Sequence, residues 1–557
     1  MKLVERTLVL GGFLAAGCVW AQGMDTILVN GKVVSADERG SVHQALAIRD
    51  GRIVAVGSAA EVRKLAGPAT HAVDLGGRTV IPGLIDSHIH AIRAALSYGT
   101  EVHWFGAGSV AEALERVRAA ARQSQPGRWL IVAGGWTEEQ FKERRRPTQA
   151  ELVAAAPQNP VYVQWMYGWA MLTPLAHEAL GIKSEADLPG GGKYERDAGG
   201  NPTGAIVGGI VPLFDKLPRP TFEQKVEGTH KFFRELNRVG LTGVSDPGGF
   251  NMSPAEYAPL FKLWRDRQLT LRVAYSYFSQ KRGKELEEFR ELTQLLPMGF
   301  GDEQLKFNGI GERVTFGMYN NDNPGDAEKE EFYKAAKWAA DQGMTLTQHW
   351  QNGDSVHHLL DVLERVNRDA PIARLRWSIA HLNNGTEASF QRMKALGVGW
   401  TMQDAMYYEG ERLLKERGEA ALRRMPPLRT AMKAGVSIGA GTDAHRVANY
   451  NPFVALRWML DGKSAGGVDL RGADETPDRM QALRMYTSGS AWFTHDEEKR
   501  GTLAAGKLAD LAVLSGDYLT VPVSRIGAIH SVLTMLGGRI VYAEGEYAKL
   551  DPGGAAR

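Results

Sequence analysis

The central part of the chain alternates short apolar runs with amphipathic stretches. This pattern predicts β-strands separated by helices, and so an α/β fold with a parallel sheet. Eight apolar runs qualify as strands, at 83–90, 240–246, 271–277, 304–310, 344–350, 376–382, 397–403 and 436–443. Eight is the number of strands in a TIM (β/α)8 barrel. We therefore predict such a barrel as the catalytic domain, over 83–499.

The interval between the first and second of these runs is much longer than the others. It contains strand-like sequences of its own, RWLIVAGG and PVYVQWM, together with many aromatic residues. We interpret about 95–235 as an insertion that covers the mouth of the barrel.

Both ends of the chain have a different pattern, in which short β-rich runs are separated by tight turns. Four dipeptides are typical of β-hairpins: Asn30-Gly31, Asp50-Gly51, Gly76-Gly77 and Gly537-Gly538. An all-β pattern at both termini predicts one small β-sandwich domain assembled from 25–82 and 500–548. The last residues, 549–557, are expected to form a loose tail.

The first 21 residues resemble an export signal. Lys2 and Arg6 precede an apolar run over 7–21 that is shorter than the ~20 residues a membrane-spanning helix needs. Such a segment is typical of a cleaved secretory signal over 1–21. The sequence at 15–18 also resembles a bacterial lipobox, in which lipidation of Cys18 would tether the protein to a membrane. Both interpretations place the mature chain outside the cytoplasm, and we expect it in the periplasm.

The amino-acid composition excludes several kinds of partner and site. The 557 residues include 66 basic and 64 acidic side chains, so the formal net charge of +2 does not point to nucleic acid as a partner. Cys18 is the single cysteine, which excludes disulfide frameworks, thiolate metal sites and iron–sulfur clusters.

Polar residues close several of the predicted strands. The active sites of TIM barrels lie at the carboxyl ends of the strands, and residues two apart in a strand point the same way. His88 and His90 could therefore hold one ion. Buried polar groups cost free energy unless they have partners, and a metal ion would satisfy all of them. Imidazole and carboxylate ligands suit Zn²⁺, or Mn, Fe or Co. The candidate ligands are His88, His90, Lys306, His349, His381 and Asp443.

Four segments together resemble the amidohydrolase superfamily, and within it the YtcJ-like (amidohydrolase 3) branch. They are VIPGLIDSHIH (80–90), ARLRWSIAHL (373–382), SIGAGTDAH (437–445) and RGTLAAGKLADLAVLSGD (500–517). The resemblance implies a metal-bearing TIM barrel flanked by a β-sandwich, with one or two divalent ions at the six candidate positions. In binuclear members the strand-four lysine is carboxylated and bridges two ions, which implies a carboxylated Lys306 here.

The sequence departs from the branch in two places. Asn308-Gly309 follows Lys306, where the branch has Asp-Gly at a slightly longer spacing. The insertion reads Tyr167-Gly168-Trp169-Ala170 where the branch reads Asp-Gly-His-Ala, which favours a more apolar or stacking substrate pocket. The candidate substrate contacts are Trp136, Tyr167, Trp169, Glu312, Gln403 and Tyr407, and Glu312 could instead orient a ligand.

These observations predict an exported metal-dependent hydrolase. It would cleave an amide-type C–N bond (amide, cyclic amide or carbamate) of a small molecule by metal-activated hydroxide, with Asp443 as general base and then general acid. The open alternatives are an ester or lactone hydrolase with the same site, and a non-catalytic binding protein on the same scaffold. No transmembrane helix is expected in the mature chain. A lipid anchor and a homodimer remain open.

Overall fold

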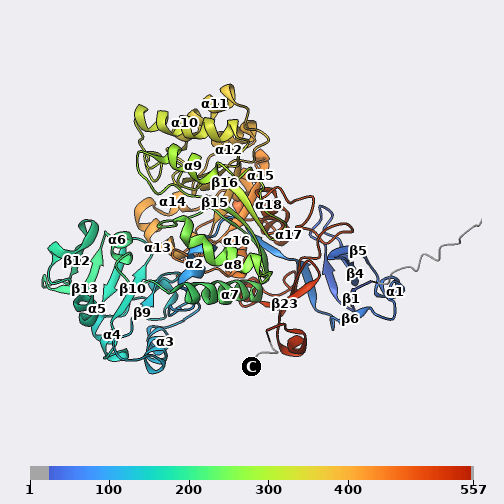
Figure 1. The fold of residues 1–557 in the computed structure, drawn as a ribbon, viewed down its shortest axis with the longest axis horizontal. Coiled ribbons are helices and arrows are strands. Elements are labelled where there is room, and N and C mark those ends of the chain that lie inside the picture. Colours follow the sequence, from blue (N-terminus) through green and yellow to red (C-terminus); the bar gives the residue numbers. More distant parts are fainter. Residues whose placement is uncertain (1–23, 554–557) are drawn as a thin grey trace, which may run out of the picture.

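The computed structural model describes residues 24–553, and two parallel four-stranded sheets form its centre (Figure 1). One contains β8 (Leu84–Asp86), β14 (Leu241–Asp246), β15 (Arg272–Tyr277) and β16 (Leu305–Ile310). The other contains β17 (Thr347–Trp350), β18 (Ser378–His381), β19 (Gly399–Gln403) and β20 (Ile438–Gly441). A bridge between Ile310 and Leu346 joins the two sheets on one side. On the other side the Ser87 amide donates to the Ala440 carbonyl at 3.0 Å. All eight predicted strands are therefore present.

Amphipathic helices cover the outside of these sheets. In α11, Leu359, Leu363 and Val366 recur at the spacing of one helix face and are buried. The ends of α12 are also specified locally, because the Thr386 side chain caps its start and Gly397 ends it at a φ of +68°. The larger covering helices are α2 (Ala91–Tyr98), α7 (Phe222–Arg238), α8 (Ala258–Arg265), α9 (Glu285–Thr293), α10 (Asp326–Asp341), α11 (Val356–Asp369), α12 (Glu387–Leu396), α13 (Ala405–Arg417), α15 (Leu428–Ala434), α16 (Pro452–Asp461) and α17 (Arg479–Met485).

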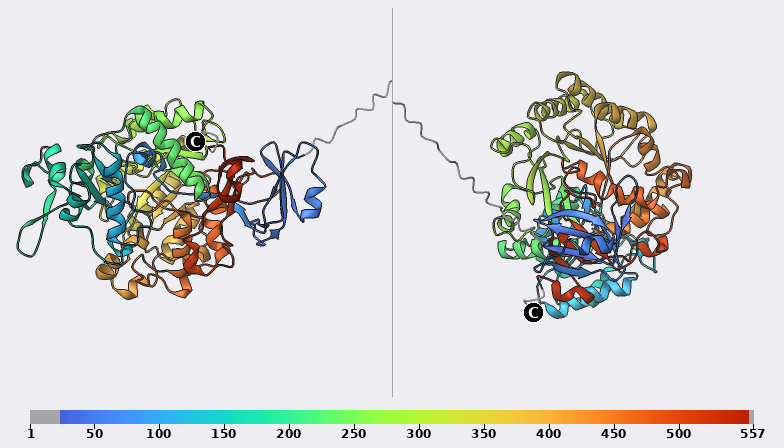
Figure 2. Two further views of the ribbon diagram at one scale, coloured as in Figure 1. Left: turned by 90° about the horizontal axis from the view of Figure 1, so that it is seen from below. Right: turned by 90° about the vertical axis from the view of Figure 1, so that its right-hand side faces the viewer.

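The two ends of the chain form the predicted β structure together, so blue and red strands lie side by side in Figure 2. One sheet has the order β23-β22-β21-β7-β2-β3 and the other the order β5-β4-β1-β6. Their bounds are β1 (Thr26–Val29), β2 (Lys32–Val34), β3 (Val42–His43), β4 (Ala45–Arg49), β5 (Arg52–Gly57), β6 (His71–Asp74), β7 (Thr79–Pro82), β21 (Leu511–Leu514), β22 (Ser531–Leu536) and β23 (Arg539–Ala543).

Two of the four predicted hairpins are wrong. Asp50-Gly51 and Gly537-Gly538 do join antiparallel neighbours, β4 with β5 and β22 with β23. Asn30-Gly31 and Gly76-Gly77 instead carry the chain from one sheet to the other. A tight turn specifies a change of direction, but the packing of the two sheets decides which strand pairs with which.

The insertion has a sheet of its own, in the order β12-β13-β11-β10-β9. Its strands are β9 (Leu130–Val132), β10 (Val161–Trp165), β11 (Trp169–Leu172), β12 (Lys193–Arg196) and β13 (Pro202–Val207), and its helices include α3 (Val110–Gln123), α4 (Gln149–Ala155), α5 (Pro174–Ala179) and α6 (Ile210–Phe214). Figure 2 shows the insertion and the terminal β structure on opposite sides of the central sheets. The Gly135 amide donates to the Arg446 carbonyl at 3.1 Å, so the insertion contacts the loop that follows β20.

The expected signal over 1–21 and its Cys18 lie outside the described residues. Of the expected tail, Asp551 pairs with Arg234 and accepts a hydrogen bond from the Ala543 amide at 3.2 Å, so this part is held in place. No helix within 24–553 has both the length and the apolar character that crossing a membrane requires.

Candidate metal centre

Six side chains converge at the carboxyl ends of the central strands. They come from five different strands or the loops that follow them, so no local segment could assemble the group by itself. Each is buried or almost buried. The six are His88 and His90 after β8, Glu312 after β16, His349 in β17, His381 at the end of β18, and Asp443 after β20.

Glu312 lies at the centre of this group. Its Oε2 is 2.9 Å from Nδ1 of His349 and 3.2 Å from Nε2 of His381. The same carboxylate also lies 3.4 Å from Nε2 of both His88 and His90. Glu312 thus belongs to two groups of potential ligands, one with His88 and His90 and the other with His349 and His381.

Asp443 is the second carboxylate of the group. Its Oδ1 is 3.0 Å from Nε2 of His90 and 3.7 Å from Nε2 of His88. Asp443 has a φ of +57° and His381 a φ of +71°, which is unusual for residues other than glycine. Strained backbone of this kind persists where the surrounding structure holds it, and it is frequent at functional sites.

The arrangement fits a metal ion. Within the described chain, both ring nitrogens of His88 and Nε2 of His349 are buried without a hydrogen-bond partner. Such atoms are costly unless something binds them. Ligand atoms at about 2.1 Å from a tetrahedral ion lie about 3.4 Å from one another. The separations of 3.0–3.7 Å around His88 and His90 agree with that geometry. Four imidazoles and two carboxylates are also the donor set that Zn²⁺ and its neighbours prefer.

The electrostatics keep both carboxylates charged. Burial alone would raise the pKa of Glu312, but the surrounding imidazoles, His349 first, bring it well below its ordinary value. The pKa of Asp443 is also lowered, because contacts with His90 outweigh the effect of burial. Burial and the charge of Arg93 favour the neutral ring of His90, yet Asp443 and Glu312 raise its pKa. Two negative charges are therefore available to a cation.

Neighbouring groups orient the histidines. The Nδ1 of His90 lies 2.5 Å from the Gly248 carbonyl, which leaves Nε2 directed at the carboxylates. The Asp86 carboxylate accepts from the His88 amide at 3.0 Å and from the Thr442 hydroxyl at 2.7 Å, so it ties β8 to the loop after β20. The Gln403 carbonyl accepts from the His381 amide at 2.7 Å. Contacts of this kind fix the rings of metal-binding histidines.

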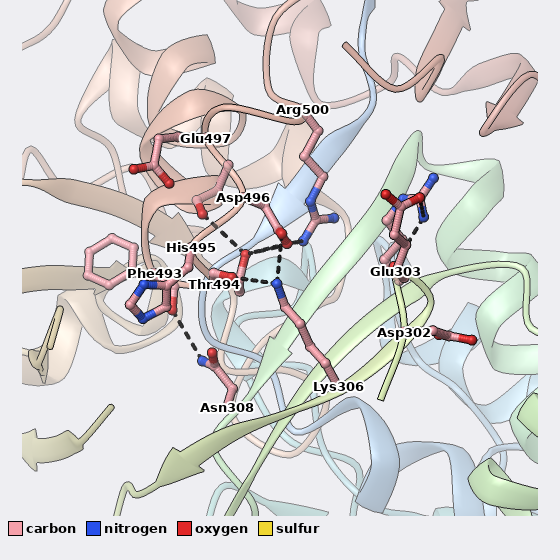
Figure 3. A network of polar contacts seen from close by, with 12 residues as sticks. Asp302, Glu303, Lys306, Asn308, Phe493, Thr494, His495, Asp496, Glu497 and Arg500 are labelled. Carbon is pink, nitrogen blue, oxygen red and sulfur yellow. Dashed lines mark hydrogen bonds and ion pairs between the residues drawn. The ribbon is translucent and has the colours of Figure 1, made fainter. Parts of the chain in front are cut away.

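Lys306 is not part of this group, which corrects the prediction of a lysine ligand and of its carboxylation. It is the second residue of β16, whereas the group forms beyond the end of that strand at Glu312. The strand from Lys306 to Ile310 alone spans roughly 13 Å, and Glu312 lies two residues beyond its end. Figure 3 shows Lys306 directed at Asp496, to whose Oδ1 it donates at 2.7 Å, and it also donates to the Thr494 carbonyl at 2.5 Å. Asp496 is held as well by Arg500 at 2.9 Å.

Lys306→Met should therefore leave the metal content unchanged. It removes one partner of a largely buried ion pair, and we expect the free energy of unfolding to fall by about 1–3 kcal/mol. Arg500 and Lys306 lower the pKa of Asp496 to about 2 against the effect of burial. The stabilisation that Asp496 provides is thus present above its ordinary pKa of 3.8 and is lost as the pH falls toward 2. Denaturant unfolding at several pH values, with elemental analysis, tests this. Loss of the metal in Lys306→Met would contradict it.

The structure brings His88 and His90 together, but not for the reason that the sequence pattern predicted. β8 ends at Asp86, and His90 immediately precedes α2, so the two histidines do not share the face of a strand. Their side chains converge because the chain turns from strand to helix between them. The local periodicity of an apolar run could not distinguish these two routes.

The candidate substrate contacts have three different environments. Trp136 and Trp169 are buried in the insertion's own core, where the Trp136 indole donates to the Gln164 carbonyl at 2.8 Å. Glu312 lies among the histidines, and the Gln403 side chain accepts a hydrogen bond from the His381 amide.

The two tyrosines lie in different places. Tyr407 packs beside Tyr408, whereas Tyr167 lines a pocket next to the metal centre. Of the six, Tyr167 is the one that retains a place for substrate contact.

Sequence reasoning missed Arg93 and the Glu101–Arg446 pair. Glu101 bonds both Arg446, at 2.9 Å, and His445, at 2.8 Å, and so holds the loop after β20 against the barrel's first helix and the insertion. Glu101, His103 and His445 form another group of potential ligands. Arg446 Nη1 lies only 3.3 Å from Nε2 of His445, and its positive charge disfavours a metal ion there. Arg93 follows the candidate ligand His90 by about one helical turn, and this spacing was the sequence signal that could have placed Arg93 beside the metal centre.

Comparison with known proteins agrees with this geometry. Residues 71–542 match a model of the amidohydrolase family. The chain is 27% identical to the N-substituted formamide deformylase of Arthrobacter pascens over 94% of its own length and 99% of that protein. It is 23% identical to the putative amidohydrolase YtcJ of Bacillus subtilis, over 93% and 99% of the two chains, which confirms the predicted branch.

Solved structures confirm the predicted fold class. An uncharacterized metal-dependent hydrolase from Pyrococcus horikoshii has a TM-score of 0.65 at 21% identity, covering 90% of this chain and 99% of that one. A zinc-bound adenosine deaminase from Xanthomonas campestris has a TM-score of 0.55 at 16% identity, covering 95% and 96%. Because the family match extends over most of the chain, this protein belongs to the amidohydrolase family and is a hydrolase of C–N bonds.

Proposed function

We propose that the protein is an exported metal-dependent hydrolase that cleaves an amide C–N bond of a small molecule. The observation that carries this proposal is the position of Glu312, which belongs to two groups of potential ligands, one with His88 and His90 and the other with His349 and His381. Two groups of ligands that share one carboxylate suit one or two divalent ions, with zinc as the first candidate. Glu312 would then have the bridging role that the family resemblance assigned to a carboxylated lysine.

The relatives support the type of bond. The chain aligns over almost its entire length with a protein named N-substituted formamide deformylase, whose name describes an amide substrate. An amide-type carbonyl is shared by amides, cyclic amides and carbamates. Ester and lactone carbonyls are open to the same chemistry, and a substrate panel distinguishes them from amides.

The residues of this chain would divide the reaction among them. His88, His90, His349, His381, Glu312 and Asp443 would hold the metal. When bound, the metal would lower the pKa of water toward 7 and polarise the substrate carbonyl. Asp443 has an Oδ1 3.0 Å from Nε2 of His90, and its side chain is 12% exposed, so solvent and substrate can reach it. Asp443 would accept the proton of the attacking water and return it to the leaving nitrogen, as general base and then general acid.

Export rests on the sequence of residues 1–21. A basic start followed by an apolar run is typical of a secretory signal, and Cys18 offers a lipid anchor as the alternative. The N-terminal sequence of the mature protein separates the two. Cleavage before Gln22 supports secretion, and a lipidated Cys18 supports anchoring.

The first experiment is elemental analysis of the purified protein, followed by a panel of N-formyl amides, N-acetyl amides, cyclic amides and esters. We expect one to two equivalents of Zn, Mn, Fe or Co, and turnover of at least one amide that chelation abolishes. Re-addition of the metal should restore the activity. Absence of metal after incubation with divalent ions would contradict the proposal, and so would turnover of esters alone.

A further inference from the structure

A pocket lies between the insertion and the carboxyl ends of the central strands. It encloses about 120 Å³, on the order of ten times the space that one water molecule needs. Ile131, Phe214 and Leu217 form the wall on the insertion side, and Leu96 and Met252 form the wall on the barrel side. Most of this surface is apolar, as is usual for pockets that bind small molecules.

The charged groups of the pocket are paired, with one exception. Arg446 pairs with Glu101 at 2.9 Å, Lys225 with Glu256 at 3.4 Å, and Arg219 with Asp215 at 3.9 Å. Among residues 24–553, no carboxylate lies within ion-pair distance of Arg93. Its contacts are a hydrogen bond of 2.5 Å to the Tyr167 hydroxyl and the rings of Tyr167 and Phe250, at 5.8 and 5.7 Å. The guanidinium therefore brings to an apolar pocket a positive charge that has no direct ion-pair partner among these residues.

Arg93 also borders the metal centre. It follows His90 by three residues, in the first turn of α2. A Cβ placed on Gly249 would lie 3.4 Å from Cδ and Nε of Arg93 and 3.5 Å from Nδ1 of His90, so both side chains lie against this glycine. The negative charge of Asp443 favours the charged form of Arg93, which places the two side chains in the same region. An anion bound by Arg93 would thus lie close to the metal centre.

The metal centre itself does not require this charge. Glu312 and Asp443 together contribute two negative charges, which one divalent ion neutralises and two ions exceed. A partly buried guanidinium without a counter-ion is unfavourable, and a bound carboxylate would offset that cost. The planar fork of an arginine matches the two oxygens of a carboxylate.

We propose that the substrate is an amide that carries a carboxylate within a few bonds of the scissile nitrogen, and that Arg93 binds this carboxylate while the neighbouring pocket takes an apolar group. This inference rests on the proposed function, since it places the scissile amide at the metal centre. Tyr167 acts as a positioning residue, because its hydroxyl holds the guanidinium.

The kinetic test uses two formamides that differ only in the carboxylate, N-formylphenylalanine and N-formylphenethylamine. We expect the wild-type protein to favour the first by about 10- to 100-fold in kcat/KM, as expected for a charged hydrogen-bonded pair. Arg93→Gln should lose this preference, mainly through KM, while its metal content stays at the wild-type value. Tyr167→Phe should lose part of it. Arg122→Gln removes the same charge from an exposed position on α3, 64% exposed, and should retain the preference.

A binding test separates this inference from the proposed function. Calorimetry would compare 3-phenylpropionate with 3-phenylpropanol, on the protein as purified and after chelation. The carboxylate should bind more tightly by about 10- to 100-fold, and Arg93→Gln should remove that difference even without metal. Equal binding of the two probes by the wild-type protein would overturn the inference, as would an unchanged preference in Arg93→Gln. Loss of turnover with Arg93-dependent binding intact would count against the proposed reaction alone.

Discussion

Glu312→Gln should release most of the bound metal and lower kcat by at least about 10⁴-fold, since a site without metal no longer activates water. The reason is geometric and electrostatic. Glu312 lies within 3.4 Å of four imidazoles, and it is the carboxylate that the two groups of ligands share. Glutamine keeps the shape of the side chain but removes its charge. Elemental analysis and turnover of the best amide from the panel measure the two effects.

Two other variants sharpen this test. Glu312→Asp keeps the charge but shortens the side chain, so we expect weaker metal binding and partial activity. Lys306→Met changes a residue near the start of β16, whereas Glu312 follows the end of that strand, so this variant should bind metal as the wild-type protein does. Full metal content in Glu312→Gln together with metal loss in Lys306→Met would reverse the assignment of the ligand and restore the lysine.

Asp443→Asn should lower kcat per bound metal ion by about 10²–10⁴-fold, the usual contribution of general acid–base catalysis. Asparagine can keep a ligand oxygen toward the metal centre, but it cannot accept and return the proton. In the wild-type protein, Oδ1 of Asp443 lies 3.0 Å from Nε2 of His90 and 3.7 Å from Nε2 of His88, so some loss of metal is also expected in the variant. Turnover must therefore be divided by the metal content measured in the same sample.

The two effects of Asp443→Asn can be separated. Titration with added Zn²⁺ should restore occupancy without restoring the rate. Recovery of near-normal turnover at full occupancy would show that Asp443 is only a ligand and that another group moves the proton. A rate that stays low at full occupancy supports its role as base and acid.

The sequence alone determined the fold class and five of the six residues at the centre. Eight apolar runs, each separated from the next by amphipathic stretches, were sufficient for the strands, because burial on both faces leaves an unambiguous apolar pattern. His88, His90, His349, His381 and Asp443 stood out because polar side chains at the ends of buried strands need partners.

The tertiary structure decided what local patterns could not express. Lys306 and Glu312 are close in sequence, yet the strand between them sends one to each end of the sheet, so only Glu312 reaches the histidines. Asn30-Gly31 resembles a hairpin but joins two sheets, because packing partners, and not the turn, choose the pairing. The sequence could not show that Arg93 lacks an ion-pair partner, because its neighbours come from the insertion and the barrel and are distant in sequence. Secondary structure follows from the pattern of side chains along the chain, whereas a functional site depends on which distant segments pack against one another.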